Sequence, residues 1–198
     1  MRVSIFIFLT LLLFSCTDNR YNKLEFKAIQ DISNDYLRIK DLNQSLIKPG
    51  SQIAPDTIKK QNNYKVFISD ALLPISQAKE NNRLMFDIIF KNENPHLDSI
   101  ANSIVDSKNF KRLKYRKFNK SRLEFANPYR QFVEHKSEIG KDEEYVIISF
   151  SRICFSADDK YGLVVIDYEH VWPNGTGVGF NRPYLIEKKN NEWKVINE

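Results

Sequence analysis

The chain has 198 residues, 42% hydrophobic and 13% aromatic, with a formal net charge of +5. This length suits one domain, or a domain with a small extension, and the 14 Phe and 9 Tyr are enough for a packed core. With only two cysteines, Cys16 and Cys154, a fold held together by several disulfides is excluded.

The N-terminus combines a single positive residue, Arg2, with an apolar run of 12 residues, Val3 to Phe14. A membrane-spanning helix needs roughly 18 or more apolar residues, so this run is too short to span a bilayer. Its length suits the hydrophobic part of a signal peptide. The run ends in Leu13-Phe14-Ser15-Cys16, and polar residues follow at 17–20.

These residues resemble a bacterial lipoprotein signal peptide with its lipobox. The resemblance implies removal of residues 1–15, a diacylglycerol on the Cys16 thiol and location in the bacterial cell envelope. The outer membrane is the expected site, with its periplasmic or surface side left open. Two alternatives are a buried first element of the domain and an ordinary secretory peptide. Cys16 and the polar residues after it favour lipidation.

Removal of residues 1–15 changes the net charge from +5 to +4, because Arg2 is the one charged residue among them. Cys154 is then the remaining thiol, so we expect no internal disulfide. It lies in the apolar, strand-like run from Ser151 to Phe155, which favours a buried, inert cysteine over a nucleophile.

In chain order, the predicted organisation is a signal peptide at 1–15, a polar tether at 16–23 and a single α+β domain at 24–198. Spacings of three and four between apolar residues predict an amphipathic helix from Leu24 to about Leu46. A loop is expected at 49–63. The next predicted elements are strands at 64–68 and 84–90, a turn at 92–95 and a helix at 97–105.

The C-terminal third predicts an antiparallel meander of four strands, with the N-terminal helix packed on the sheet. The first strand covers 145–155, with a change of phase near residues 151–152 that indicates a bulge. A turn at 157–162 leads to a strand at 163–172, and a turn at 173–177 follows. A closing hairpin pairs 184–188 with 193–196, and Trp193 is expected in the core.

The closing segment Tyr184 to Val195, with its Asn190-Asn191 turn and Trp193, resembles the last hairpin of cystatin-like and NTF2-like α+β domains. The longer stretch from Ser149 to Trp193 is similar to the C-terminal segment of uncharacterised bacterial lipoproteins. Both resemblances imply an α+β fold, and neither implies a catalytic residue.

Residues 108–122 hold eight basic residues and no acidic one, interleaved with Phe110, Tyr115 and Phe118. In a cytosolic protein this pattern would indicate nucleic-acid binding, but a lipid anchor argues against a nucleic-acid partner. The expected partners are the membrane itself and an anionic envelope component or a protein. The alternative is a solvated strand face with lysines beside core aromatics. The candidate anion-binding residues are Lys111, Arg112, Lys114, Arg116 and Lys117.

Metal, cofactor and catalytic motifs are not evident. The three histidines, His96, His135 and His170, lack metal-ligand spacing. On the predicted strand, Asp167 and Glu169 share one face and His170 lies on the other. The sequence therefore favours a lipid-anchored, non-enzymatic binding module. An envelope hydrolase acting on polysaccharide or peptidoglycan, which would use the two carboxylates, and an inhibitor or immunity-type lipoprotein remain open.

Overall fold

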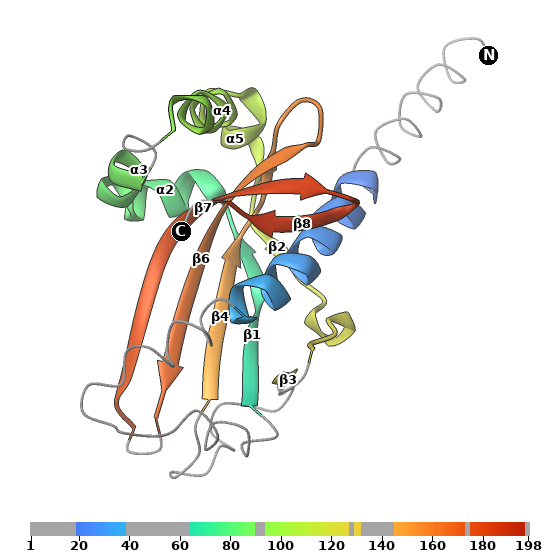
Figure 1. The fold of residues 1–198 in the computed structure, drawn as a ribbon, viewed down its shortest axis with the longest axis vertical. Helices are drawn as coiled ribbons and strands as arrows, with labels where there is room; N and C mark the ends of the chain where they lie inside the picture. The colour runs from blue at the N-terminus through green and yellow to red at the C-terminus, as the bar shows by residue number, and fades with distance from the viewer. Residues whose placement is uncertain are drawn as a thin grey trace, which may run out of the picture.

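A mixed β-sheet forms the centre of the computed structural model, which describes residues 19–38, 64–89, 94–126, 129–131, 145–172 and 175–196. In the described part, the strand order is β2-β1-β4-β6-β7-β8, with β3 beside β1 and β5 beside β6 (Figure 1). The strands are β1 (Tyr64–Leu73), β2 (Arg116–Lys117), β3 (Tyr129–Gln131), β4 (Tyr145–Ser151), β5 (Cys154–Phe155), β6 (Tyr161–Val171), β7 (Gly177–Lys189) and β8 (Glu192–Val195).

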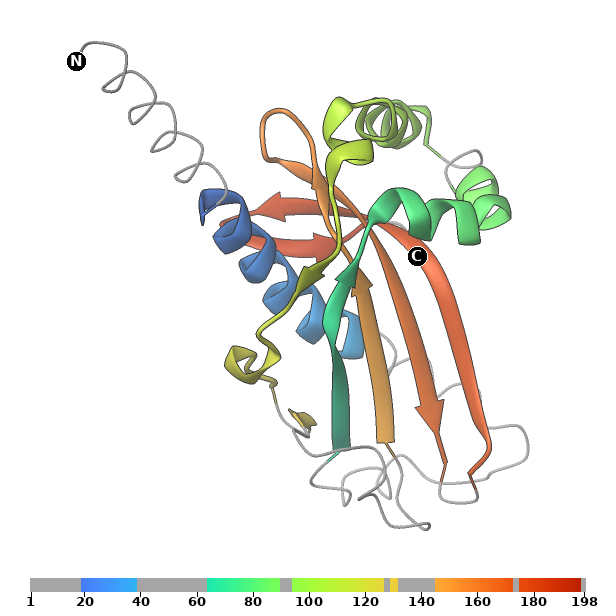
Figure 2. The same cartoon turned by 180° about the vertical axis from the view of Figure 1, so that it is seen from behind.

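Helices lie on both faces of this sheet (Figure 2). Residues 19–38 form a helix that we call the N-terminal helix. The other helices are α2 (Ile75–Asn81), α3 (Arg83–Ile89), α4 (Pro95–Val105), α5 (Lys108–Arg112) and the 3₁₀ helix η2 (Lys120–Arg122). The α+β class predicted from the sequence is therefore confirmed.

The predicted antiparallel meander is formed by β4, β6, β7 and β8, which pair in that order. Asn190 and Asn191 join β7 to β8 with φ values of 51° and 66°. Two consecutive residues with positive φ are typical of the primed turns that match the twist of a hairpin. β7 begins at Gly177, so Gly177 and Gly179 belong to a strand.

The predicted change of phase in the first strand is also confirmed. β4 ends at Ser151, and β5 starts at Cys154. Between them, the Arg152 N–H donates to the Leu73 carbonyl oxygen at 2.7 Å instead of to a partner on β6. The interruption brings Ile153 and Phe155 into the same core as the buried residues of β4.

β1 pairs with β4 in parallel, an arrangement the sequence did not predict. It is also longer than the predicted strand at 64–68, because it continues to Leu73. Parallel neighbours require a long crossover connection. Here, that connection contains α2 to α5.

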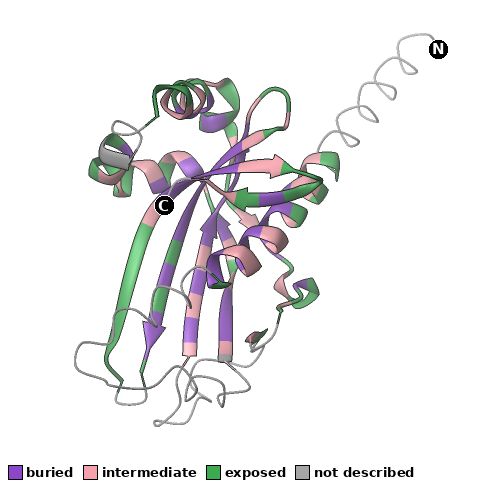
Figure 3. Cartoon of the chain, viewed as in Figure 1, coloured by how far each residue is buried: buried purple, intermediate pink, exposed green. Residues whose placement is uncertain are grey.

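The N-terminal helix packs its apolar side on one face of the sheet (Figure 3). Its buried residues follow the predicted spacing of three and four; they are Ala28, Ile29, Ile32, Tyr36 and Leu37. Their neighbours on the sheet include Ile148 of β4 and Ile166 of β6. The predicted packing is confirmed, whereas residues 39–46 of the predicted helix lie outside the described residues.

The helix begins earlier than predicted. Residues 19–23, assigned from the sequence to a polar tether, are helical, while residues 16–18 lie outside the described residues. Tyr21 explains the difference, because its ring packs edge-on against Phe155 with 5.5 Å between centroids. Its hydroxyl donates to the Ile153 carbonyl oxygen. The polar character of the neighbouring residues did not indicate that Tyr21 is half-buried.

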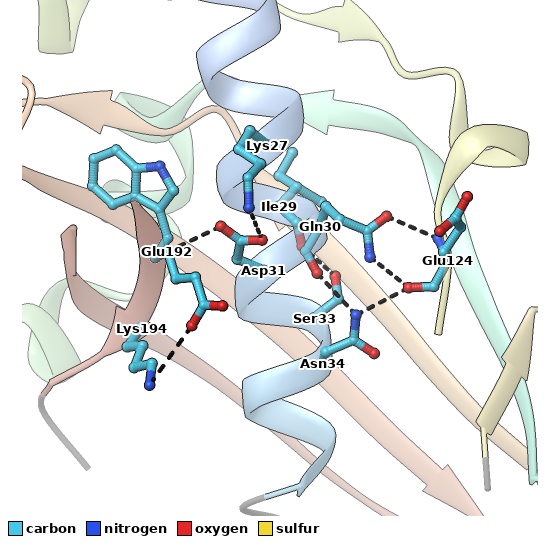
Figure 4. A network of polar contacts seen from close by, with 10 residues as sticks. Lys27, Ile29, Gln30, Asp31, Ser33, Asn34, Glu124, Glu192 and Lys194 are labelled. Carbon is cyan, nitrogen blue, oxygen red and sulfur yellow. Dashed lines mark hydrogen bonds and ion pairs between the residues drawn. The ribbon is translucent and has the colours of Figure 1, made fainter. Parts of the chain in front are cut away.

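Polar contacts hold the N-terminal helix on two sides (Figure 4). On one side, the Gln30 and Asn34 amides donate to the Glu124 carbonyl oxygen, and the Glu124 N–H donates to Gln30 at 2.8 Å. On the other side, Asp31 accepts from the Trp193 backbone N–H on β8 at 3.0 Å. The helix therefore connects β8 with the segment that follows η2.

The opposite face of the sheet is covered near one end by α2 to α5. A second core forms there from helix residues such as Phe86, Ile104 and Phe110 with Leu163 and Val165 of β6. These β6 residues alternate with those that face the N-terminal helix, as expected for a strand buried on both faces. The predicted helix at 97–105 is confirmed as α4.

The prediction of a strand at 84–90 is wrong, because residues 83–89 form α3. Phe86 is buried in the second core, whereas Leu84 is 76% exposed. A short apolar run does not by itself distinguish a buried strand from a helix.

Candidate functional site

The basic stretch at 108–122 is divided among α5, β2 and η2 and does not form one strand. Ser107, directly before this stretch, caps α5: its hydroxyl accepts a hydrogen bond from the Phe110 N–H at 3.3 Å. Phe110 and Phe118 are each 3% exposed and anchor the segment to the two cores, whereas Tyr115 is 60% exposed. Two of the three interleaved aromatics therefore serve packing.

Four of the five candidate anion-binding residues lie within seven consecutive positions of the chain, and we call them together the basic surface: Lys111, Arg112, Lys114 and Lys117. All four are exposed. Within the described part of the chain, none of them has an ion pair. Their charge is therefore available to a partner.

Arg116, the fifth candidate, is bound internally. Its Nη2 atom lies 2.7 Å from Oε2 of Glu25, and its side chain is 24% exposed. Burial lowers the pKa of Arg116 from its ordinary value, and the nearby Glu25 carboxylate acts in the opposite direction. The Arg116 charge is therefore neutralised internally by Glu25, and anion binding by Arg116 stays a prediction. A charged side chain that is mostly removed from water needs an internal partner of opposite charge.

Glu25, which is fully buried, is the centre of this network. Its carboxylate accepts from Arg152 Nε at 2.9 and 3.1 Å and from the Ile153 N–H at 2.9 Å, in addition to pairing with Arg116. Arg152 Nη1 donates to the Lys114 carbonyl oxygen at 2.8 Å. Two guanidinium groups thus share one carboxylate, which leaves a surplus positive charge next to Lys114.

The network fixes Lys114, one residue of the basic surface, near the start of the N-terminal helix. Glu25 lies six residues after the first described helical residue, Asn19. At 1.5 Å per residue, that is about 9 Å along the helix axis. Arg20 anchors the same end through Asp159, at 3.1 Å. In Figures 1 and 2, α5 and the start of the helix both lie in the upper half of the view, on either side of the turn between β5 and β6 and away from the lower end of β7.

Sequence reasoning missed the Glu25 network. The available signal was a charged residue on an apolar side: Glu25 is in phase with the buried Ala28, Ile29 and Ile32. Arg152 carried the same signal, because it interrupts a buried strand. A buried charge flanked by apolar residues implies a partner of opposite charge, although the sequence alone does not identify it.

Asp167 and Glu169 are both exposed on one face of β6, and Tyr168 and His170 are buried on the other, as predicted. Burial, and then the charge of Glu169, raise the pKa of Asp167 from its ordinary value. The two carboxylates lie on one strand and point the same way. They do not face each other across a substrate, as a glycosidase pair does, so the geometry does not favour the hydrolase hypothesis.

Cys154 is fully buried, as predicted. Its Sγ atom lies 3.6 Å from the Ser107 hydroxyl, and burial raises the pKa of the thiol from its ordinary value. This setting disfavours the thiolate that a nucleophile needs.

Within the described ranges, no group of three His, Cys, Asp or Glu side chains is placed to hold a metal ion. His96 is exposed on α4, and His135 lies outside the described residues. Among the helices that the structure describes, none is both long enough and apolar enough to cross a bilayer.

No protein-family model matches the chain, and no curated protein matches it at a significant level.

Proposed function

We propose that this chain is a lipid-anchored protein of the bacterial cell envelope and acts there as a non-enzymatic interaction module. The apolar run from Val3 to Phe14 and the sequence Leu13-Phe14-Ser15-Cys16 support the anchor. The anchored form would begin at Cys16, with its acyl chains in the outer membrane. A mature lipoprotein carries more than one chain, which gives more stable binding than a single acyl group.

The start of the N-terminal helix supports an orientation on the membrane. Asn19 is already helical and lies three residues after Cys16. Three extended residues span at most about 10 Å. A lipid on Cys16 would therefore hold this end of the domain close to the headgroups, without a long flexible spacer.

The observation that carries the proposal is the position of the basic surface at this same end. Each Lys or Arg near an anionic surface contributes roughly 1 kcal/mol, and the effect falls off within a Debye length of about 8–10 Å. The four side chains of the basic surface have no internal ion pairs in the described part of the chain. Anionic headgroups, of phospholipid or lipopolysaccharide, are the partner that this arrangement fits.

A paired charge change tests this proposal. In residues 17–198, which lack the anchor, Lys114→Gln with Lys117→Gln should weaken binding to phosphatidylglycerol vesicles by about 10- to 30-fold at low salt. Binding of the parent should also decrease as salt is added. Vesicle sedimentation at several salt concentrations measures both effects.

The matched control is Lys65→Gln with Arg130→Gln, which removes the same charge at the start of β1 and in β3. It should bind the vesicles nearly as well as the parent. Equal loss in the two variants, or binding that does not depend on salt, would contradict the proposal. Arg116 is left unchanged in both, because its replacement would disturb the buried network.

A further inference from the structure

The outer edge of β7 is open over much of its length. β8 pairs with β7 only from Ile186 to Lys189, and the Ile196 N–H donates to the Leu185 carbonyl oxygen at 3.0 Å. Before these residues, β7 is the last strand of the sheet in the described part of the chain (Figure 1). Its inner edge pairs continuously with β6, from Gly177 opposite Val171 to Glu187 opposite Tyr161.

The direction of the open backbone groups follows from this pairing. The Leu185 carbonyl points outward to the chain after β8, whereas the Lys188 N–H points inward to the Lys160 carbonyl oxygen. Alternate residues of an antiparallel strand direct both backbone groups to the same edge. Gly177, Gly179 and Asn181 therefore point their N–H and C=O groups outward.

These three residues lie within a run of five exposed residues, 177–181, on the lower part of β7 in Figure 3. For their outward groups, no partner is found in the part of the chain that the structure describes. Pro183 has no N–H, so the row of outward donors stops there. The open edge thus offers three donors and three acceptors.

The two faces beside this edge differ in chemistry. On one face, Val178 and Phe180 are 36% and 37% exposed. On the other face, Gly179 lies opposite Glu169, and Asn181 lies opposite Asp167. A Cβ atom added at Gly179 would lie 3.1 Å from the Tyr168 carbonyl oxygen and 3.8 Å from the Glu169 Cβ, so a side chain here would stand directly beside Glu169.

Gly177 likewise has no side chain on this face of the sheet. A Cβ atom at this position would lie 2.6 Å from the His170 carbonyl oxygen, a contact that a side chain does not tolerate. Asp167 and Glu169 have neither a hydrogen bond nor an ion pair within the described residues. They are two negative charges on one face, next to a strip without bulky side chains.

We infer that the Gly177–Asn181 edge of β7 binds an extended peptide segment of a partner protein, in which apolar residues alternate with Lys or Arg. An added strand would lie about 4.8 Å from β7 and pair with its outward N–H and C=O groups. Its apolar residues would pack beside Val178 and Phe180. Its basic residues would extend over Gly177 and Gly179 to Glu169 and Asp167.

A second copy of this chain fits the edge less well. Pairing β7 with itself would bring two glycine strips together and leave both carboxylate pairs without a cation. The edge also lies at the end of the molecule away from the basic surface, where a partner would reach it if the chain is anchored as proposed.

Asn181→Pro tests the inference in the full chain, held in detergent. The substitution removes an outward N–H and, like the natural Pro183, should leave the ladder with β6 intact. The probe is a short capped peptide that alternates valine and lysine and carries a fluorophore. We expect Asn181→Pro to weaken its binding, measured by fluorescence anisotropy, by about tenfold. Asn181→Ala keeps the N–H and should bind nearly as the parent does.

Charge is tested separately. Asp167→Asn with Glu169→Gln should weaken binding of the valine–lysine peptide. The parent protein should bind a valine–glutamate peptide more weakly than the valine–lysine peptide. Unchanged binding by Asn181→Pro at an unchanged melting temperature would overturn the inference. So would equal affinity for the two peptides, or a dimer in sedimentation that Asn181→Pro dissociates, because the occupant would then be a second copy.

Discussion

Glu25→Ala is expected to lower the free energy of unfolding by about 3–5 kcal/mol, because it removes the one carboxylate that two guanidinium groups share. Arg152 would remain buried without a counter-charge, and the Ile153 N–H would lose its acceptor. For a domain of this size, each kcal/mol corresponds to a shift of about 2–4 °C in melting temperature. Thermal unfolding followed by circular dichroism measures the loss.

Glu124→Ala is the matched control. Glu124 is exposed and contacts the N-terminal helix through its backbone groups, which alanine retains. Its removal should change the melting temperature little. If Glu25→Ala and Glu124→Ala have the same melting temperature, the buried ion pairs of Glu25 do not stabilise the fold.

Trp193→Ala should cost about 3–5 kcal/mol as well, because Trp193 is the largest of the fully buried side chains, at 1% exposure. Its ring centroid lies 5.0 Å from that of Phe155, and its backbone N–H donates to Asp31 of the N-terminal helix. Alanine would leave a cavity where the helix, β5 and β8 meet. Denaturant unfolding gives the free energy directly.

Trp193→Phe separates packing from polarity. The indole Nε1 of Trp193 is buried and has no hydrogen-bond partner in the described structure. Phenylalanine removes this unpaired donor and keeps most of the apolar area, so its cost should be clearly smaller than that of alanine. Equal losses from both changes would indicate that the indole N–H has a partner on which stability depends.

The C-terminal meander was predictable because its signals are local. Alternating apolar residues, the Asn190-Asn191 turn and the change of phase at 151–152 each act within a few residues. The parallel pairing of β1 with β4 was not predictable in the same way. Nothing within Tyr64–Leu73 specifies a partner that follows more than seventy residues later in the chain.

The errors at 19–23 and 84–90 arise from tertiary contacts. Tyr21 extends the N-terminal helix by packing on Phe155, and Phe86 lies against a core built by other elements. Neither contact is visible in local periodicity. The same limit applies to the basic stretch. The sequence located its charge, but Arg116 became part of the interior only because Glu25, far away in the chain, lies beside it.

Metabolic labelling with palmitate, followed by intact mass measurement, tests the proposed lipid anchor at Cys16. The parent protein should carry label, lack residues 1–15 and begin at a lipid-modified Cys16. Cys16→Ser should give an unlabelled chain that retains residues 1–15. Palmitate label on Cys16→Ser, or an unlabelled parent protein, would rule out the lipid anchor at Cys16.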